Sequence, residues 1–319
     1  MNFNTRVLSM LGACGAYGLA ACELPSIHDN IAFFTADLQN FSGLDRFARA
    51  YPDKFYNVGI AEQNLLNVAA GFASEGNIAF ASTYASFACT RCLDQVSVSM
   101  AYMGLNVKLV GLTSGFSVGI LGPTHESLSD LSIMQSFPNI TILSPADGIE
   151  TVKSVMAAAE ITGPVYIRFT GTMNLPIVYK TDFDYKVGKA VKLRDGSDVS
   201  IIATGTMVAE SLKASEILAE HGLSASVYDM HTIRPLDKES IIEASKSRLL
   251  VTAEEHSIVG GLGTAVDTVI IDNTIPVKRL KIGVPCEFSA AASYKALLEK
   301  YGLTASQIAD SILAKIGEC

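Results

Sequence analysis

The sequence predicts an α/β protein built from two doubly wound domains. Short apolar runs of strand length alternate with longer stretches whose apolar residues recur at helical spacing, which is typical of a parallel sheet covered by helices on both faces. The alternation breaks at residues 174–185, which contain Pro176, and then resumes. A length of 319 residues also favours two domains. We therefore expect a first domain at residues 1–175, a linker at 176–186 and a smaller second domain at 187–319.

The first domain is expected to form a parallel sheet from several short apolar runs. Buried strands are predicted at residues 31–36, 78–81, 107–112, 141–145 and 165–169, with an extended piece at 55–58. Helices are predicted at residues 7–22 and 147–161. Three more are expected: one that begins at about Glu62, one that ends at about Met103, and one that begins near Glu126.

The second domain repeats the alternation. Strands are predicted at residues 199–203, 225–229, 249–253 and 277–282, helices at 207–221, 238–247 and 263–272, and two more helices at the C-terminal end. The run Gly260–Gly263 lacks the GxGxxG spacing of a dinucleotide site. We expect a tight turn there, and structural or interface roles for Glu254, Glu255 and His256.

Composition narrows the possible functions. Apolar residues make up 49% of the chain and no uninterrupted apolar run reaches about 18 residues, so we expect a cytoplasmic protein that does not span a membrane. The net charge of −8 argues against a nucleic-acid surface. Among the six cysteines, Cys89 and Cys92 form a single CxxC, which cannot complete a zinc site. Both are expected to be buried apolar residues, and no metal ligand is predicted in this chain.

A carboxylate is directed at a buried face in residues 56–73. Leu65, Leu66, Ala69 and Ala73 recur at helical spacing, and Glu62 lies in the same stripe. A glutamate in the first turn of a helix commonly does no more than meet the helix dipole. The alternative is a desolvated carboxyl that holds or donates a proton near pH 7.

Other polar and aromatic residues are predicted to follow the ends of strands, where open parallel sheets bind ligands. They are a turn at residues 37–43, Tyr84 and Phe87 three residues apart, and a long glycine-containing loop at 113–125 that ends in His125. Each also has an ordinary interpretation, because paired aromatics are usually core residues and a lone histidine often caps a helix. The long loop nevertheless suggests function.

Several short motifs together resemble the thiamine-diphosphate-dependent transketolase family. They are Gly59-Ile60-Ala61-Glu62-Gln63-Asn64, Thr83-Tyr84-Ala85-Ser86-Phe87, Asp94-Gln95-Val96, Gly122-Pro123-Thr124-His125, Ser144-Pro145-Ala146-Asp147 and Tyr166-Ile167-Arg168. Each motif is weak alone, but all occur in the family's order and spacing, and the resemblance extends from about residue 6 to the C-terminus. It implies a transferase of carbohydrate metabolism, and it makes Glu62 a candidate catalytic acid.

The resemblance covers only the pyrimidine-binding domain and the C-terminal domain of a transketolase. The family holds the diphosphate and its magnesium ion with a Gly-Asp-Gly motif on another domain, and that motif is absent from these 319 residues. We therefore expect this chain to be the second subunit of a split transketolase. An N-terminal subunit would bind the diphosphate and Mg²⁺, and two copies of each chain would form an α2β2 heterotetramer.

The resemblance also implies roles for individual residues. A protonated Glu62 would hydrogen-bond the aminopyrimidine and so promote loss of the thiazolium C2 proton, and His125 would contact substrate oxygens. Phe87 would stack on the pyrimidine, with Tyr84 and Asp37 close to the cofactor. The implied ligands of a sugar-phosphate substrate are Arg168, with Ser42 and Arg6 as helpers.

Two departures from the family pattern concern the substrate. Leu121 replaces the acidic residue that usually precedes Gly-Pro-Thr-His, and Thr113 replaces a histidine at the start of the same loop. Leucine cannot hydrogen-bond a sugar hydroxyl, so we expect a modified or deoxy sugar. Two alternatives stay open: another thiamine diphosphate enzyme, resembling 1-deoxyxylulose-5-phosphate synthase or a 2-oxoacid dehydrogenase beta subunit, and a non-catalytic scaffold or regulatory subunit.

Overall fold

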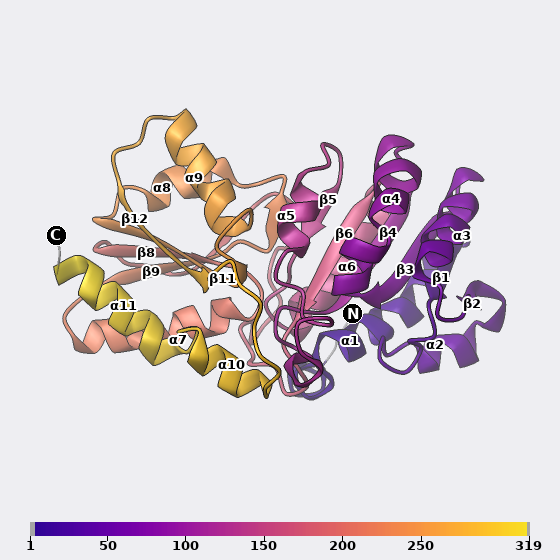
Figure 1. Cartoon of the computed structure of the whole chain (residues 1–319), viewed down its shortest axis with the longest axis horizontal. Coiled ribbons are helices and arrows are strands. Elements are labelled where there is room, and N and C mark those ends of the chain that lie inside the picture. The colour runs from indigo at the N-terminus through magenta and orange to yellow at the C-terminus, as the bar shows by residue number, and fades with distance from the viewer. Residues whose placement is uncertain (1–3, 318–319) are drawn as a thin grey trace.

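The computed structural model describes residues 4–317 and contains two sheets that lie side by side (Figure 1). The larger sheet has seven strands in the order β10-β5-β6-β4-β3-β1-β2. All its neighbouring strands are parallel except β10, which runs antiparallel to β5. Their bounds are β1 (Ile31–Thr35), β2 (Phe55–Asn57), β3 (Ile78–Tyr84), β4 (Val107–Ser114), β5 (Thr141–Leu143), β6 (Val165–Thr170) and β10 (Thr232–Arg234).

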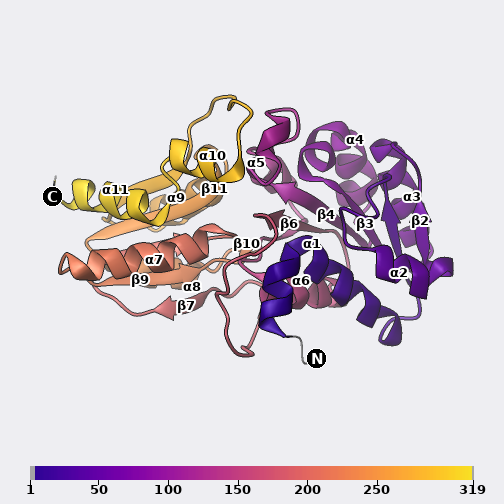
Figure 2. The same ribbon diagram turned by 90° about the horizontal axis from the view of Figure 1, so that it is seen from below.

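Helices cover both faces of this sheet, as a doubly wound domain requires. Figure 2 shows α1 and α6 together on one face, and Figure 1 shows α3 and α4 on the other. The helices are α1 (Thr5–Glu23), α2 (Asp45–Ala50), α3 (Glu62–Ser74), α4 (Leu93–Gln95), α5 (Asp130–Gln135) and α6 (Gly148–Glu160). Turns of π-helix at Phe87–Arg91 and Val96–Tyr102 flank α4, and short 3-10 helices lie at Leu24–Ser26, Pro52–Lys54 and Gly119–Leu121.

The second sheet has five strands in the order β12-β11-β8-β9-β7, with only β7 antiparallel to its neighbour. The strands are β7 (Val191–Arg194), β8 (Val199–Ala203), β9 (Ala225–Asp229), β11 (Leu249–Ser257) and β12 (Lys278–Val284). The helices are α7 (Met207–Glu220), α8 (Lys238–Ala244), α9 (Leu262–Asp272), α10 (Tyr294–Lys300) and α11 (Ala305–Gly317). The predicted fold class of two doubly wound α/β domains is thus confirmed.

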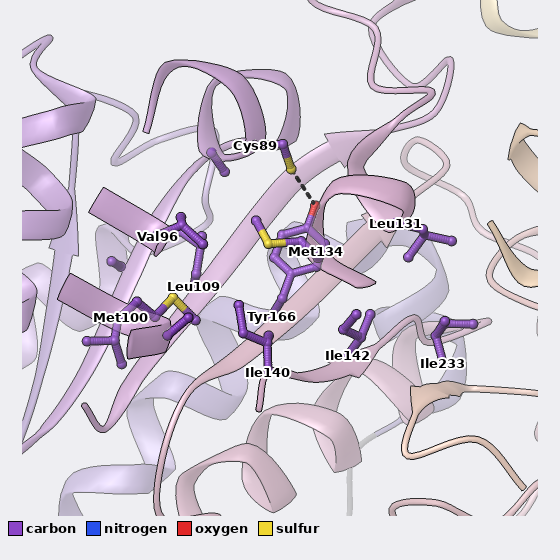
Figure 3. Close-up of a cluster of buried hydrophobic side chains, with 14 of the residues drawn as sticks. Cys89, Val96, Met100, Leu109, Leu131, Met134, Ile140, Ile142, Tyr166 and Ile233 are labelled. Carbon is purple, nitrogen blue, oxygen red and sulfur yellow. Dashed lines mark hydrogen bonds between the residues drawn. The ribbon is translucent and has the colours of Figure 1, made fainter. Parts of the chain in front are cut away.

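Buried side chains form three clusters, one of which spans both sheets. Figure 3 shows part of this spanning cluster, where the Cys89 thiol lies 3.8 Å from the hydroxyl oxygen of Tyr166. Cys89 and Cys92 are both buried, as predicted. The cluster and strand β10, which lies after residue 187 yet completes the first sheet, join the two halves of the chain.

The structure departs from the sequence-based expectation in several places, which include helix α2 at Asp45–Ala50. The short edge strands β7 and β10 were not predicted, because three or four residues carry little periodic signal. The helix expected near Glu126 begins at Asp130, because residues 122–129 form turns and a bridge. The helix through Met103 is interrupted by π-turns rather than being uniformly α.

The first helical stretch is the one candidate for a membrane span among residues 4–317. Thr5–Ser26 is long and apolar enough by length and composition. Half of its most apolar window is buried, and Leu8, Ala16 and Tyr17 pack into the core beneath β1 and α6. This packing agrees with the helix predicted at residues 7–22.

Candidate active site

Side chains from several segments meet beyond the carboxyl ends of β1, β3 and β4, which are adjacent in the sheet. Tyr84 is the last residue of β3 and Phe87 begins the following π-turn. His125 lies in the loop after β4, and its ring centroid is 5.2 Å from that of Phe87 and 5.9 Å from that of Tyr84. Glu62 is linked to this group through Arg91. Topology thus brings together Glu62, Tyr84, Phe87 and His125.

Glu62 is the first residue of α3 and is 5% exposed. Gly59 adopts a φ of 76°, which lets the chain turn sharply between β2 and this helix. Leu65, Leu66 and Ala69, on the same stripe, are completely buried and fix the orientation of the helix. The predicted burial of the Glu62 carboxyl is therefore confirmed.

The predicted apolar surroundings of Glu62 are wrong in one respect, because its neighbour is a cation. Arg91 Nη1 lies 2.5 Å from Glu62 Oε1, and Arg91 Cζ lies 3.9 Å from the centroid of the Phe87 ring. Sequence reasoning missed Arg91, although residues four apart on a helix commonly meet and Phe87 and Arg91 have that spacing. In this chain the two lie within one π-turn, closed by a bond from Cys92 N to Phe87 O.

The aromatic residues form a small wall next to this ion pair. The ring of Tyr84 packs edge to face on Phe87, with centroids 5.8 Å apart, and the centroid of the Phe41 ring lies 6.2 Å from that of Tyr84. His125 completes the group, and its Nδ1 lies 3.0 Å from Thr124 Oγ1. A planar ligand could therefore stack on one ring and meet a polar atom at its edge.

Asp37 lies in a strained turn that is tied to the Glu62 segment. Its φ is 59°, which is uncommon for a residue other than glycine. The side chain of Asn57 bonds both the carboxylate and the backbone N of Asp37, at 3.1 Å each, and also accepts from Gly59 N at 3.0 Å. Asn57, which sequence reasoning missed, thus fixes Asp37 relative to the turn before Glu62.

The structure places Arg168 outside this group, in a sealed network. Its side chain is 0% exposed, its Nε donates to Asp130 Oδ2 at 2.7 Å, and its Nη2 donates to the carbonyl of Glu255 at 2.8 Å. Tyr166 OH also donates to Asp130 Oδ2. Its Nη1 is buried without a partner among the described residues. Arg168 is thus closed off from solvent in this structure, and its contact with a sugar phosphate stays a prediction.

The other expected substrate residues lie in different settings. Ser42 is fully buried and its hydroxyl donates to the carbonyl of Gln39 at 2.9 Å, so it is not available to a substrate in this conformation. Thr113 has a φ of 53°, and its buried hydroxyl has no partner among the described residues. Leu121 is 48% exposed in the loop after β4, and Arg6 is exposed in the first turn of α1.

The residues present fit the pyrimidine half of thiamine diphosphate. The pocket already accommodates a planar group that donates hydrogen bonds, since the Arg91 guanidinium bonds Glu62 and stacks on Phe87. An aminopyrimidine is also planar and offers polar atoms at its edge. Among residues 4–317 no group of three or more His, Cys, Asp or Glu side chains could hold a metal ion. The geometry therefore fits the organic ring and supplies no candidate metal site in the described part of the chain.

Comparison with known proteins agrees with the fold. Residues 13–174 match the pyrimidine-binding domain of transketolase, and residues 188–308 match the transketolase C-terminal domain. The chain therefore belongs to the transketolase family.

Several similar proteins match this chain over most of their own length. A putative transketolase C-terminal section from Methanocaldococcus jannaschii is 39% identical over 94% of this chain and 95% of its own. The 6-deoxy-6-sulfo-D-fructose transketolase subunit SqwH of a Clostridium species is 41% identical, over 88% and 87% of the two chains. A solved structure described as a split gene transketolase, inactive beta4 tetramer, is 40% identical, with a TM-score of 0.88 and coverage of 95% and 97%.

Proposed function

We propose that this chain is the C-terminal subunit of a two-chain transketolase that transfers a ketol unit from a ketose donor to an aldose acceptor. The observation that carries the proposal is a nearly buried carboxyl, Glu62, paired with Arg91, whose guanidinium lies over the Phe87 ring beside His125. Thiamine diphosphate, when bound, supplies a nucleophilic carbon that carries the transferred unit.

The chain's own residues would bind and orient the cofactor and the substrate and would donate protons to them. Phe87 offers a ring face on which the pyrimidine can stack, with Tyr84 as the second wall and Asp37 near the cofactor. Glu62, at the amino end of α3, would hydrogen-bond the pyrimidine nitrogen and hold a proton there. His125, whose ring packs against that of Phe87, would donate a hydrogen bond to the oxygens of the substrate, where negative charge develops.

A partner subunit is needed for the remaining half of the cofactor. The described residues contain no metal cluster, and the sequence contains no Gly-Asp-Gly motif. The 40% identical solved structure is described as an inactive tetramer of beta chains. We infer that an N-terminal subunit binds the diphosphate and Mg²⁺, and that two copies of each chain form a heterotetramer. The five cysteines among the described residues are free thiols, which fits the cytoplasm.

The substrate is proposed to be a modified or deoxy sugar phosphate or sulfonate. Leu121 is half-exposed within the loop after β4, where it presents an apolar surface instead of a carboxylate. The similar Clostridium subunit is named for 6-deoxy-6-sulfo-D-fructose, which is one such sugar. Leu121→Asp should shift kcat/KM toward donors that carry the additional hydroxyl, by about tenfold.

The test is reconstitution. This chain would be co-purified with its partner subunit and assayed with thiamine diphosphate and Mg²⁺, using xylulose 5-phosphate, 6-deoxy-6-sulfofructose or pyruvate as donor and several aldoses as acceptors. Cofactor-dependent transfer from a ketose supports the proposal. Turnover of pyruvate alone would instead favour a synthase or a 2-oxoacid dehydrogenase subunit, and the absence of turnover and cofactor binding would indicate a scaffold. Equal or better turnover of xylulose 5-phosphate and ribose 5-phosphate would contradict the modified-sugar part.

A further inference from the structure

The Arg91 side chain makes two contacts that a bound pyrimidine would also need. Its Nη1 is 2.5 Å from Glu62 Oε1, and its Cζ is 3.9 Å above the Phe87 ring. A guanidinium is planar, delocalised and rich in N–H donors, and it stacks well on aromatic faces. In shape and hydrogen bonding it therefore resembles an aminopyrimidine held between the same two residues.

The Glu62 carboxyl and the Phe87 ring cannot serve both groups in the same way. A carboxyl oxygen at 2.5 Å from a guanidinium nitrogen is already engaged, and a ring face covered at 3.9 Å has no room for a second stacked ring. Both arguments concern the same side chain, Arg91.

The Arg91 side chain can adopt another position. Its side chain is 46% exposed, so the outer half already meets solvent. It borders a surface groove of about 880 Å³ that is also lined by Gln63 and by Asp94, an exposed carboxylate three residues further along the chain. Rotation of the Arg91 side chain into this groove would uncover the Phe87 ring and bring the guanidinium near another carboxylate.

We propose that the Arg91 guanidinium occupies the place of the cofactor's pyrimidine in the chain without cofactor, and that thiamine diphosphate must displace it to bind. This inference rests on the proposed function, because it concerns the same pocket. The contacts it breaks are a half-exposed ion pair and one cation–π contact, each of modest strength in water. Displacement should therefore weaken cofactor binding on the order of tenfold.

The experiment measures the Kd of thiamine diphosphate by titration calorimetry in the co-purified complex, in the presence of Mg²⁺. Arg91→Met keeps the length of the side chain but removes the planar cation, and Arg91→Lys keeps the charge but loses the planar fork. The matched control is Arg49→Met, an exposed arginine on α2. We expect Arg91→Met to bind about tenfold more tightly than wild type, Arg91→Lys to lie between them, and Arg49→Met to be unchanged.

The outcomes separate this inference from the proposed function. Unchanged or weaker binding by both Arg91 variants, with wild type binding normally, would overturn the displacement. Weaker binding would also show that the guanidinium helps to hold the cofactor. If Arg91→Met does not fold, the Kd of Arg91→Lys decides in the same way. If wild type and every variant fail to bind thiamine diphosphate, the proposed function falls, and this inference falls with it. A tighter Kd cannot arise from a purely structural role of Arg91, because losing a structural contact would loosen the pocket.

Discussion

Two arginine–carboxylate pairs in the first domain consist of the same chemical groups but lie in different environments, and the environment determines the role of each pair. Arg168 and Asp130 form a pair in which both side chains are 0% exposed, and the pair of Arg91 and Glu62 is 46% and 5% exposed. The distances are nearly equal, at 2.7 and 2.5 Å. One pair is sealed within protein, whereas the other opens to solvent on the arginine side.

The sealed pair has fixed partners from both domains. Tyr166 on β6 also donates to Asp130, and Glu255 on β11 of the second sheet accepts from Arg168. Burial by itself would raise the pKa of Asp130, but the charge of Arg168, the nearby His256 and the hydrogen bonds from Arg168 and Tyr166 together lower that pKa below its usual value. A pair with this many partners joins the domains and does not exchange. In the open pair the carboxylate and the arginine each have one strong partner, so a ligand can displace the arginine.

The largest expected effect comes from breaking the sealed pair. Asp130→Asn keeps the shape but leaves the Arg168 charge buried without a counter-charge, which should cost about 3–5 kcal/mol in free energy of unfolding. Urea denaturation of the complex or of the chain would measure it. The matched control is Asp182→Asn, because Asp182 forms an exposed ion pair with Lys153 and should change stability little. Similar stabilities for the two variants would show that the buried network does not hold the domains.

Glu62→Gln should affect activity and leave the fold intact. Glutamine keeps the size and one hydrogen-bonding oxygen but cannot exchange the proton, so kcat should fall by about a hundredfold or more. Steady-state turnover by the reconstituted complex would measure this, with Glu75→Gln at the exposed end of the same helix as control. Near-normal activity of Glu62→Gln would remove Glu62 from the mechanism.

Stability should fall with rising pH because of a buried acidic group at the boundary between the domains. Burial raises the pKa of Asp229 to about 7, and burial followed by the neighbouring Asp229 charge raises that of Glu150. An acid whose folded pKa lies above its unfolded value contributes stability that is complete below about pH 4 and is lost as pH rises through about 7.

Asp229→Asn tests this pH dependence. Between pH 5 and 7 the wild type should lose about 2 kcal/mol more unfolding free energy than Asp229→Asn. Urea denaturation at several pH values would measure the difference. Burial also raises the pKa of Glu254 to about 7. The unfolding free energy of the Asp229→Asn variant should therefore still fall with rising pH, but with a smaller slope. Identical pH profiles would show that Asp229 is already ionised in the folded protein.

The smallest expected effect concerns the open pair. Arg91→Met should change the free energy of unfolding by about 1 kcal/mol or less, because half of the arginine side chain already faces solvent. The same denaturation experiment compares it directly with Asp130→Asn. A loss of unfolding free energy as large as that of Asp130→Asn would mean that Arg91 has a structural role and would contradict the difference between the two pairs.

Much of the fold could be predicted from the sequence because the apolar runs are strongly periodic. The strands β1, β3, β4 and β6 and the burial of Glu62 follow from alternation and from a stripe of leucines and alanines. The tight turn at Gly260–Gly261 into α9 was also predicted, and the Glu254 carboxylate accepts from the first two backbone N–H groups of that helix. These features depend on neighbours close in sequence.

What could not be predicted depends on contacts between distant segments. Arg168 and Arg91 are both arginines near motifs of the family, and only the folded chain shows that β11 seals the first and that solvent reaches the second. Asn57 ties two turns together through side-chain bonds that leave no pattern in the sequence. Ser42 is buried by packing of its loop, not by its own polarity.

The most direct test is a structure of this chain with its partner subunit and thiamine diphosphate. We predict the aminopyrimidine stacked on Phe87 within hydrogen-bonding distance of Glu62, the Arg91 guanidinium moved off the ring, and the Arg168–Asp130 pair unchanged. A cofactor bound elsewhere, or a pyrimidine that leaves Glu62 paired only with Arg91, would contradict this account.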